Sequence, residues 1–101
     1  MIKIKVNYEK DAISSVQVTG HSGYSEAGSD IVCASVSSIC ITTVNAIVRI
    51  DNDAIKYEEA DGMLKVEINS HNKVIDTLTL NMVELLNELA NDYKDYIKII
   101  K

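Results

Sequence analysis

Apolar and polar residues alternate at the N-terminal end of the chain. Residues 2–8 place isoleucine, valine and tyrosine at every second position, with lysine and asparagine between them. This period of two is typical of a strand that is buried on one face. Residues 9–11 are polar, and residues 13–19 again carry valines at alternate positions. We therefore expect an antiparallel hairpin whose second arm is slightly irregular.

The pattern changes to a helical spacing over residues 31–50. Apolar residues recur every three or four positions, and Ser29 and Asp30 just before them are good N-cap residues. Many of the apolar residues are β-branched, which lowers intrinsic helix propensity. Burial must therefore hold this helix, and it belongs in the middle of the fold.

A second hairpin follows the helix. Residues 55–59 and 63–69 read as strands on either side of Asp61 and Gly62, and such an Asp-Gly pair is a strong signal for a two-residue turn. Alternate apolar residues of the second arm, at positions 64, 66 and 68, are expected to face the core.

The C-terminal third completes the pattern. Residues 72–92 predict an amphipathic helix, and residues 96–100 a short final strand. The expected apolar stripe of this helix consists of Val74, Ile75, Leu78, Met82, Leu85, Leu86 and Leu89. The whole chain, residues 1–101, is then one α+β domain of order β-β-α-β-β-α-β, with two helices packed on a mostly antiparallel sheet.

Charge and composition narrow the classes of function. The net charge is −5, and Arg49 is the only arginine, so a surface for nucleic acid is not expected. No signal peptide or membrane-spanning segment is apparent. Cys33 and Cys40 lie seven residues apart in one predicted helix, beyond disulfide reach, and we expect reduced thiols in a cytoplasmic protein.

Candidate chemistry lies between Gly20 and Ser37. Cys33 falls in the first turn of the predicted helix, where exposed N–H groups and the macrodipole favour a thiolate. His21 can reach it as a general base if the intervening loop folds back. The N–H groups of Cys33 and its neighbours would then serve as donors to an oxyanion.

The loop itself offers further candidates. Gly20, Gly23 and Gly28 would let a peptide backbone approach closely and would provide a hinge. Tyr24 either lines a substrate groove or anchors the loop. Asp30 is an N-cap first, and the alternative is a role in orienting His21.

Plainer interpretations stay open. Cys33 is also consistent with a small packing residue in the helix, as free cysteines usually are. No ligand spacing typical of zinc is formed by the cysteines and histidines, which are Cys33, Cys40, His21 and His71. We therefore expect neither a metal nor a cofactor. A redox sensor at Cys33 would lack a resolving cysteine within reach.

The same segment resembles a known family. The pattern GHxGYxxxGxDIVCAxVS, formed here by residues 20–37, is similar to the signature of the ribosomal-processing cysteine protease (Prp) family. The length and the element order extend this resemblance over essentially the whole chain.

The resemblance implies an activity and a partner. It implies a homodimeric cysteine endopeptidase in which Cys33 is the nucleophile, His21 the catalytic histidine and Asp30 an acidic position of the motif. The implied substrate is the precursor of a large-subunit ribosomal protein, number twenty-seven of the L series, which loses a short N-terminal extension. The alternative is a non-catalytic module for ribosome assembly, with Cys33 as a packing residue.

Overall fold

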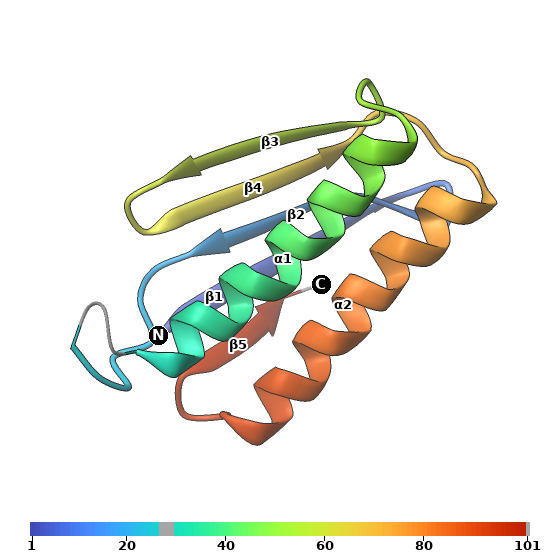
Figure 1. Ribbon diagram of the computed structural model, residues 1–101. Helices are drawn as coiled ribbons and strands as arrows, with labels where there is room; N and C mark the ends of the chain where they lie inside the picture. The colour runs from blue at the N-terminus through green and yellow to red at the C-terminus, as the bar shows by residue number, and fades with distance from the viewer. Residues whose placement is uncertain (27–29, 101) are drawn as a thin grey trace.

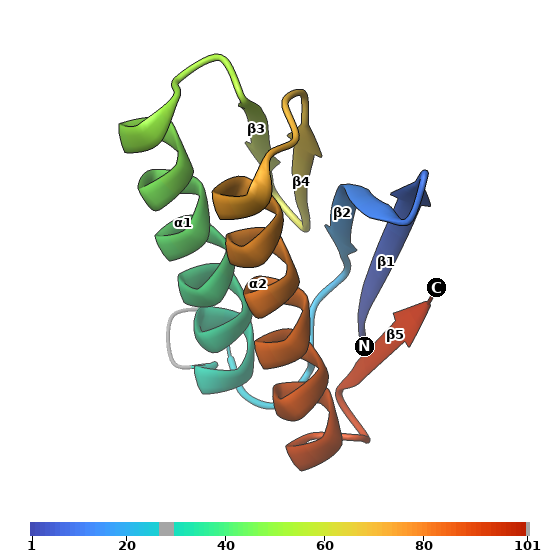
Figure 2. The same cartoon turned by 90° about the vertical axis from the view of Figure 1, so that its right-hand side faces the viewer.

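Two α-helices cover one face of a five-stranded sheet (Figures 1 and 2). The structure is a computed structural model that describes residues 1–26 and 30–100. The helices form one layer and the strands the other, as the side view in Figure 2 shows. In chain order the elements are β1 (Ile2–Glu9), β2 (Ala12–Thr19), α1 (Ile31–Ile50), β3 (Ile55–Ala60), β4 (Met63–Ile68), α2 (Lys73–Asp92) and β5 (Ile97–Ile100).

The sheet has the strand order β3-β4-β2-β1-β5. All neighbours are antiparallel except β1 and β5, which run parallel with Ile2 opposite Ile97. The predicted order of elements and the mostly antiparallel sheet are confirmed. The strand order could not be predicted from the sequence, because the pairing of β2 with β4 joins two hairpins that are separated by a helix.

The first hairpin shows the predicted irregularity. Asn7 pairs with Ser15 and Tyr8 with Ile13, so Ser14 of the second arm has no partner across the strand. The turn residues Lys10 and Asp11 both have positive φ, at 51° and 66°. Two positive φ values suit the right-handed twist of the strands in a two-residue hairpin loop.

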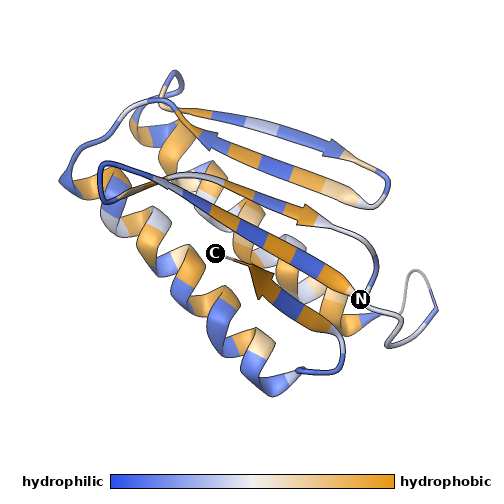
Figure 3. Cartoon of the chain, turned by 180° about the vertical axis from the view of Figure 1, so that it is seen from behind, coloured by the Kyte–Doolittle hydropathy of each residue, from blue (hydrophilic) through white to orange (hydrophobic). Residues whose placement is uncertain are grey.

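The alternation of apolar and polar residues along the strands determines which face of the sheet is buried. Ile4, Val16 and Val66 are fully buried beneath the helices, while Lys3 and Lys5 are exposed. Figure 3 shows the alternation of hydrophobic and hydrophilic residues along the strands, seen from behind. The sheet therefore contributes one face to the core and leaves the other to solvent.

Helix α1 supplies the central apolar element. Its buried side chains are Val32, Val36, Cys40, Thr43, Val44 and Ile47. By length and composition alone, α1 is long and apolar enough to cross a membrane, so the expectation that no segment of the chain approaches a membrane span was wrong. In the fold its buried face packs in the hydrophobic core.

Helix α2 differs from its predicted stripe at several positions. Val74 and Leu85 are exposed, whereas Thr79 and Val83 are buried. The helix contacts both α1 and the sheet, so its buried face is shifted around the axis from the expected one. Thr79 tolerates burial because its hydroxyl donates to the Ile75 carbonyl at 2.6 Å.

Candidate active site

The glycine loop leaves the sheet at a tightly packed point. The Gly20 N–H donates to the Gly62 carbonyl at 2.9 Å, which ties the start of the loop to the tip of the β3–β4 hairpin. Gly20 has a φ of +88°, and a Cβ placed there would lie 2.5 Å from the Met1 carbonyl oxygen. Only glycine fits this position without a shift of backbone.

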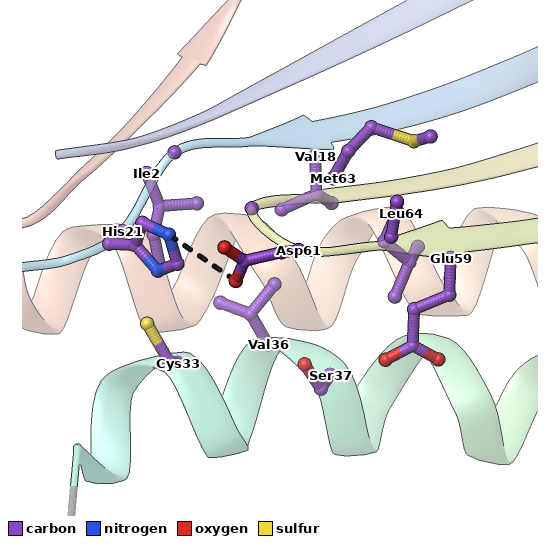
Figure 4. A pocket seen from close by; sticks show the side chains of 13 residues that line it. Ile2, Val18, His21, Cys33, Val36, Ser37, Glu59, Asp61, Met63 and Leu64 are labelled. Carbon is purple, nitrogen blue, oxygen red and sulfur yellow. Dashed lines mark ion pairs between the residues drawn. The ribbon is translucent and has the colours of Figure 1, made fainter. Parts of the chain in front are cut away.

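Two adjoining pockets meet at the start of α1. Both are lined by His21, Cys33, Ser37 and Asp61. The first, of about 310 Å³, lies between α1 and the β3–β4 hairpin, and the second, of about 620 Å³, extends along the loop. Figure 4 shows the Cys33 sulfur directed toward the side on which the His21 ring lies. The predicted nucleophile and base therefore line the same hollow.

His21 lies against the tip of the hairpin. Its Nε2 is 3.9 Å from Asp61 Oδ1, the contact drawn as a dashed line in Figure 4. Both side chains are largely exposed, so this ion pair contributes little to stability. A Cβ on Gly62 would lie 3.2 Å from the same ring nitrogen. The absence of a side chain at Gly62 therefore leaves room for the imidazole against the hairpin tip.

The start of α1 corrects one expectation. Asp30 caps the helix, and its Oδ1 accepts the N–H groups of Val32 at 2.9 Å and Cys33 at 3.0 Å. The Ala34 N–H donates to the Asp30 carbonyl at 3.1 Å. The N–H groups expected to stabilise an oxyanion are therefore already engaged by the capping residue.

Ser22 is a residue of this site that sequence reasoning missed. Its side chain is buried, and its hydroxyl donates to Asp30 Oδ2. The Ser22 N–H lies 3.4 Å from Cys33 Sγ, within the range of a hydrogen bond to sulfur. The Ser22 hydroxyl, followed by the N–H groups of Cys33 and Val32, lowers the pKa of Asp30 from 3.8 to about 2, against the opposing effect of desolvation.

This depressed pKa predicts an acid-dependent stability. The ionised Asp30 stabilises the fold fully above about pH 4, and that contribution is lost as the pH falls toward about 2. We expect the difference in free energy of unfolding between the wild type and Asp30→Ala to shrink over this range. Denaturant titrations from pH 7 downward measure it, with the exposed Asp95→Ala as the control. A difference that stays constant with pH would contradict the assignment.

The remaining candidate residues of the loop have different positions in the structure. Tyr24 packs edge-on against Tyr93 and Tyr96, with ring centroids 5.8 Å and 5.1 Å apart, which favours its role as a loop anchor. Gly23 lines the second pocket with a φ of +72°. Gly28 lies outside the described residues.

The other cysteine and histidine lie elsewhere. Cys40 is fully buried, and burial raises the pKa of its thiol to about 12. His71 Nδ1 is 2.8 Å from Asp76 Oδ1 at the start of α2. Within residues 1–26 and 30–100, no three His, Cys, Asp or Glu side chains form a group that could hold a metal ion.

The hairpin tip was also absent from the sequence-based candidates. Asp61 and Gly62 were identified only as a turn, yet they line the first pocket. No local pattern could have revealed this role, because it depends on β4 lying next to β2. For Ser22, the only signal was its place directly after His21.

Comparisons with known proteins point to one family. The model of a family described as cysteine protease Prp matches residues 1–98. The ribosomal processing cysteine protease Prp of Staphylococcus aureus is 26% identical over 101 residues, covering 97% of this chain and 94% of its own. The protein of the same name from Bacillus subtilis is 26% identical over 110 residues, covering 98% and 96%.

A solved structure shares the fold. The crystal structure of the ribosomal processing protease Prp from S. aureus, in complex with a covalently linked product peptide, superposes with a TM-score of 0.87. It is 23% identical, and the match covers 98% of this chain and 97% of that one. The residues matched by the family model include every residue that lines the two pockets. The chain thus belongs to the cysteine protease Prp family, whose members are involved in ribosomal protein processing.

Proposed function

We propose that this chain is a cysteine endopeptidase with Cys33 as the nucleophile and His21 as the general base. The observation that carries the proposal is the shared position of the two side chains, which line both of the pockets that meet at the start of α1. Family membership supplies the reaction class. The non-catalytic module is the less favoured reading, because a packing cysteine has no need of a neighbouring histidine.

The chemistry follows from the two side chains. Nε2 of His21 faces Asp61, which leaves Nδ1 to exchange a proton with Cys33 Sγ. The thiolate attacks the scissile carbonyl carbon, and the imidazolium returns its proton to the leaving amine as the peptide bond breaks. Water then attacks the thioester with His21 as base, which releases the carboxylate product and restores the thiol.

The shape of the site suits an extended peptide. Cys33 lines both pockets, which are joined by the residues that they share. A peptide that crosses the start of α1 would place residues in both pockets, with its scissile bond over the sulfur. The first pocket combines polar residues, among them His21, Glu59 and Asp61, with the apolar residues Ile2, Val18, Val36, Met63 and Leu64.

The proposed substrate is the precursor of the large-subunit ribosomal protein that is number twenty-seven of the L series. The support is the family, whose relatives are named for ribosomal processing, together with the net charge of −5, which suits a basic ribosomal partner. We also propose a cytoplasmic location, because ribosomal proteins are made there.

Incubation of the purified chain with a peptide that spans the extension and the mature N-terminus tests this function. We expect two products whose masses add to that of the peptide plus one water. A shuffled peptide of the same composition is the control. If only the shuffled peptide is cut, or neither is, this substrate is wrong.

We further propose that the enzyme is a homodimer that associates through the outer face of α1. The exposed residues of this face are uncharged from Ile31 to Val48, and the exposed Arg49 follows at its C-terminal end. The uncharged residues are Ile31, Ala34, Ser38, Ile41, Asn45 and Val48. Ile31, Ile41 and Val48 leave 51%, 36% and 41% of their surface exposed. Such an uncharged stripe is typical of a helix that packs against another.

Ile41→Glu should convert the dimer to a monomer, because a carboxylate would be buried in an apolar interface. Light scattering after size exclusion measures the mass of each form. Leu80→Glu places the same charge on an exposed apolar site of α2 and is the matched control. If Leu80→Glu dissociates the dimer and Ile41→Glu leaves it intact, α1 is not the interface.

A further inference from the structure

Ser22 differs from the other buried polar side chains among the described residues, which are Thr43 and Thr79. Each of those threonines donates to a carbonyl of its own helix. Ser22 instead reaches across the loop to Asp30, eight residues further along. Ser22 as a whole is only 4% exposed, so its hydroxyl must find its partners within the protein.

Three contacts make Ser22 a link between the two halves of the site. Its hydroxyl donates to Asp30 Oδ2 and accepts the Tyr24 N–H at 3.1 Å. Its own N–H points to Cys33 Sγ at 3.4 Å. The residue that follows His21 is therefore bound both to the cap of α1 and to the sulfur that α1 carries.

Asp30 divides its two oxygens between these halves. Oδ1 holds the first turn of α1 through Val32 and Cys33, and Oδ2 holds Ser22. The Ser22 hydrogen bond is the largest influence that keeps this carboxylate ionised. A charged acceptor makes a stronger bond than a neutral one, so Asp30 is a firm anchor for the loop.

The N–H groups at the start of α1 donate to Asp30, whereas the Ser22 N–H is directed at the Cys33 sulfur. A thiolate accepts a hydrogen bond more strongly than a thiol does. A donor fixed beside Cys33 Sγ therefore favours the nucleophilic form, and its benefit depends on how firmly the loop is held.

We propose that Ser22 is a positioning residue of the protease site, whose hydroxyl clamps the His21 segment onto Asp30 and so aims the Ser22 N–H at Cys33 Sγ. This inference rests on the proposed roles of Cys33 and His21. It assigns a function to a position that the family pattern leaves free, since that pattern reads GHxGY at residues 20–24.

Alkylation of Cys33 by iodoacetamide over a range of pH tests the clamp without any peptide substrate. Ser22→Ala should slow the reaction about tenfold near neutral pH, the effect of one hydrogen bond to a charged group. At high pH, where the thiolate forms without help, its rate should approach that of the wild type. The pH profile of alkylation for Ser22→Ala should therefore be shifted to higher pH. Loss of a hydroxyl with a purely structural role would not cause this shift.

Matched variants separate the hydroxyl from the shape of the side chain. Ser22→Thr keeps the hydroxyl and should restore most of the rate, whereas Ser22→Val has the shape of threonine without it. Ser35→Ala removes a hydroxyl that donates to the Ile31 carbonyl in α1, and it should leave the alkylation profile unchanged. Mass mapping confirms that Cys33, and not the buried Cys40, is the modified residue.

Cleavage kinetics complete the test. With the precursor peptide, Ser22→Ala should lower kcat about tenfold with little change in KM, because the clamp acts on the nucleophile rather than on the groove. An alkylation profile of Ser22→Ala that superposes on the wild type overturns the proposal, as does equal slowing by Thr and Val. If the wild-type enzyme cuts no peptide while the alkylation profile of Ser22→Ala is still shifted to higher pH, the substrate is refuted and the clamp stands.

Discussion

Cys33→Ala should reduce cleavage of the precursor peptide to the background rate, a loss on the order of 10⁴-fold or more, because no other side chain of the site is a strong nucleophile. The fold should remain, since Cys33 is only half-buried and alanine leaves the cap at Asp30 in place. Product masses report the cleavage, and circular dichroism reports the fold.

The second cysteine provides the control for this result. Cys40→Ala also removes one thiol from the same helix, but from the fully buried core. It should lower the free energy of unfolding by about 1 kcal/mol through the cavity that it leaves, with cleavage retained. If Cys33→Ala cuts as fast as the wild type, Cys33 is not the nucleophile.

His21→Gln should reduce kcat about 10² to 10⁴-fold. Glutamine keeps a polar side chain of similar reach beside the hairpin but cannot carry a proton between the thiol and the leaving amine. Peptide binding should change little, because the groove walls come mainly from α1 and the hairpin. Steady-state kinetics separate the two effects as a loss in kcat at nearly constant KM.

The other histidine offers a matched variant. His71→Gln makes the same replacement at the start of α2, where His71 contacts Asp76 and lines neither of the two pockets. Cleavage should be unaffected. Equal losses in both variants would point to a general effect of the substitution rather than to a base at position 21.

Local patterns predicted most of the fold. Helix α1 has the bounds that its capping residue and apolar spacing indicated, and each strand differs from its expected bounds by one residue at one end. These elements are visible in sequence because period and capping are local properties. The face of α2 was partly wrong, since α1 and the sheet together decide which side chains it buries.

The site was predictable only where its residues lie close in sequence. His21, Asp30 and Cys33 stand within one motif, and the structure places all three around the start of α1. Asp61 and Gly62 come from a hairpin far along the chain and needed the strand order. The sequence also did not show that Asp30 engages the first N–H groups of α1. An aspartate at this position can either accept those N–H groups as a cap or leave them free for a ligand.

The aromatic contacts of Tyr24 have a consequence for how the molecule folds. Tyr93 and Tyr96 lie between α2 and β5, and the Tyr96 carbonyl also accepts the Ile2 N–H at 2.8 Å. Both β1 and the glycine loop thus depend on residues some seventy to ninety-five positions later. Contacts of such high sequence separation form late and slow the search for the native state. The loop beside Cys33 therefore gains its aromatic support only when the two distant ends of the chain have met.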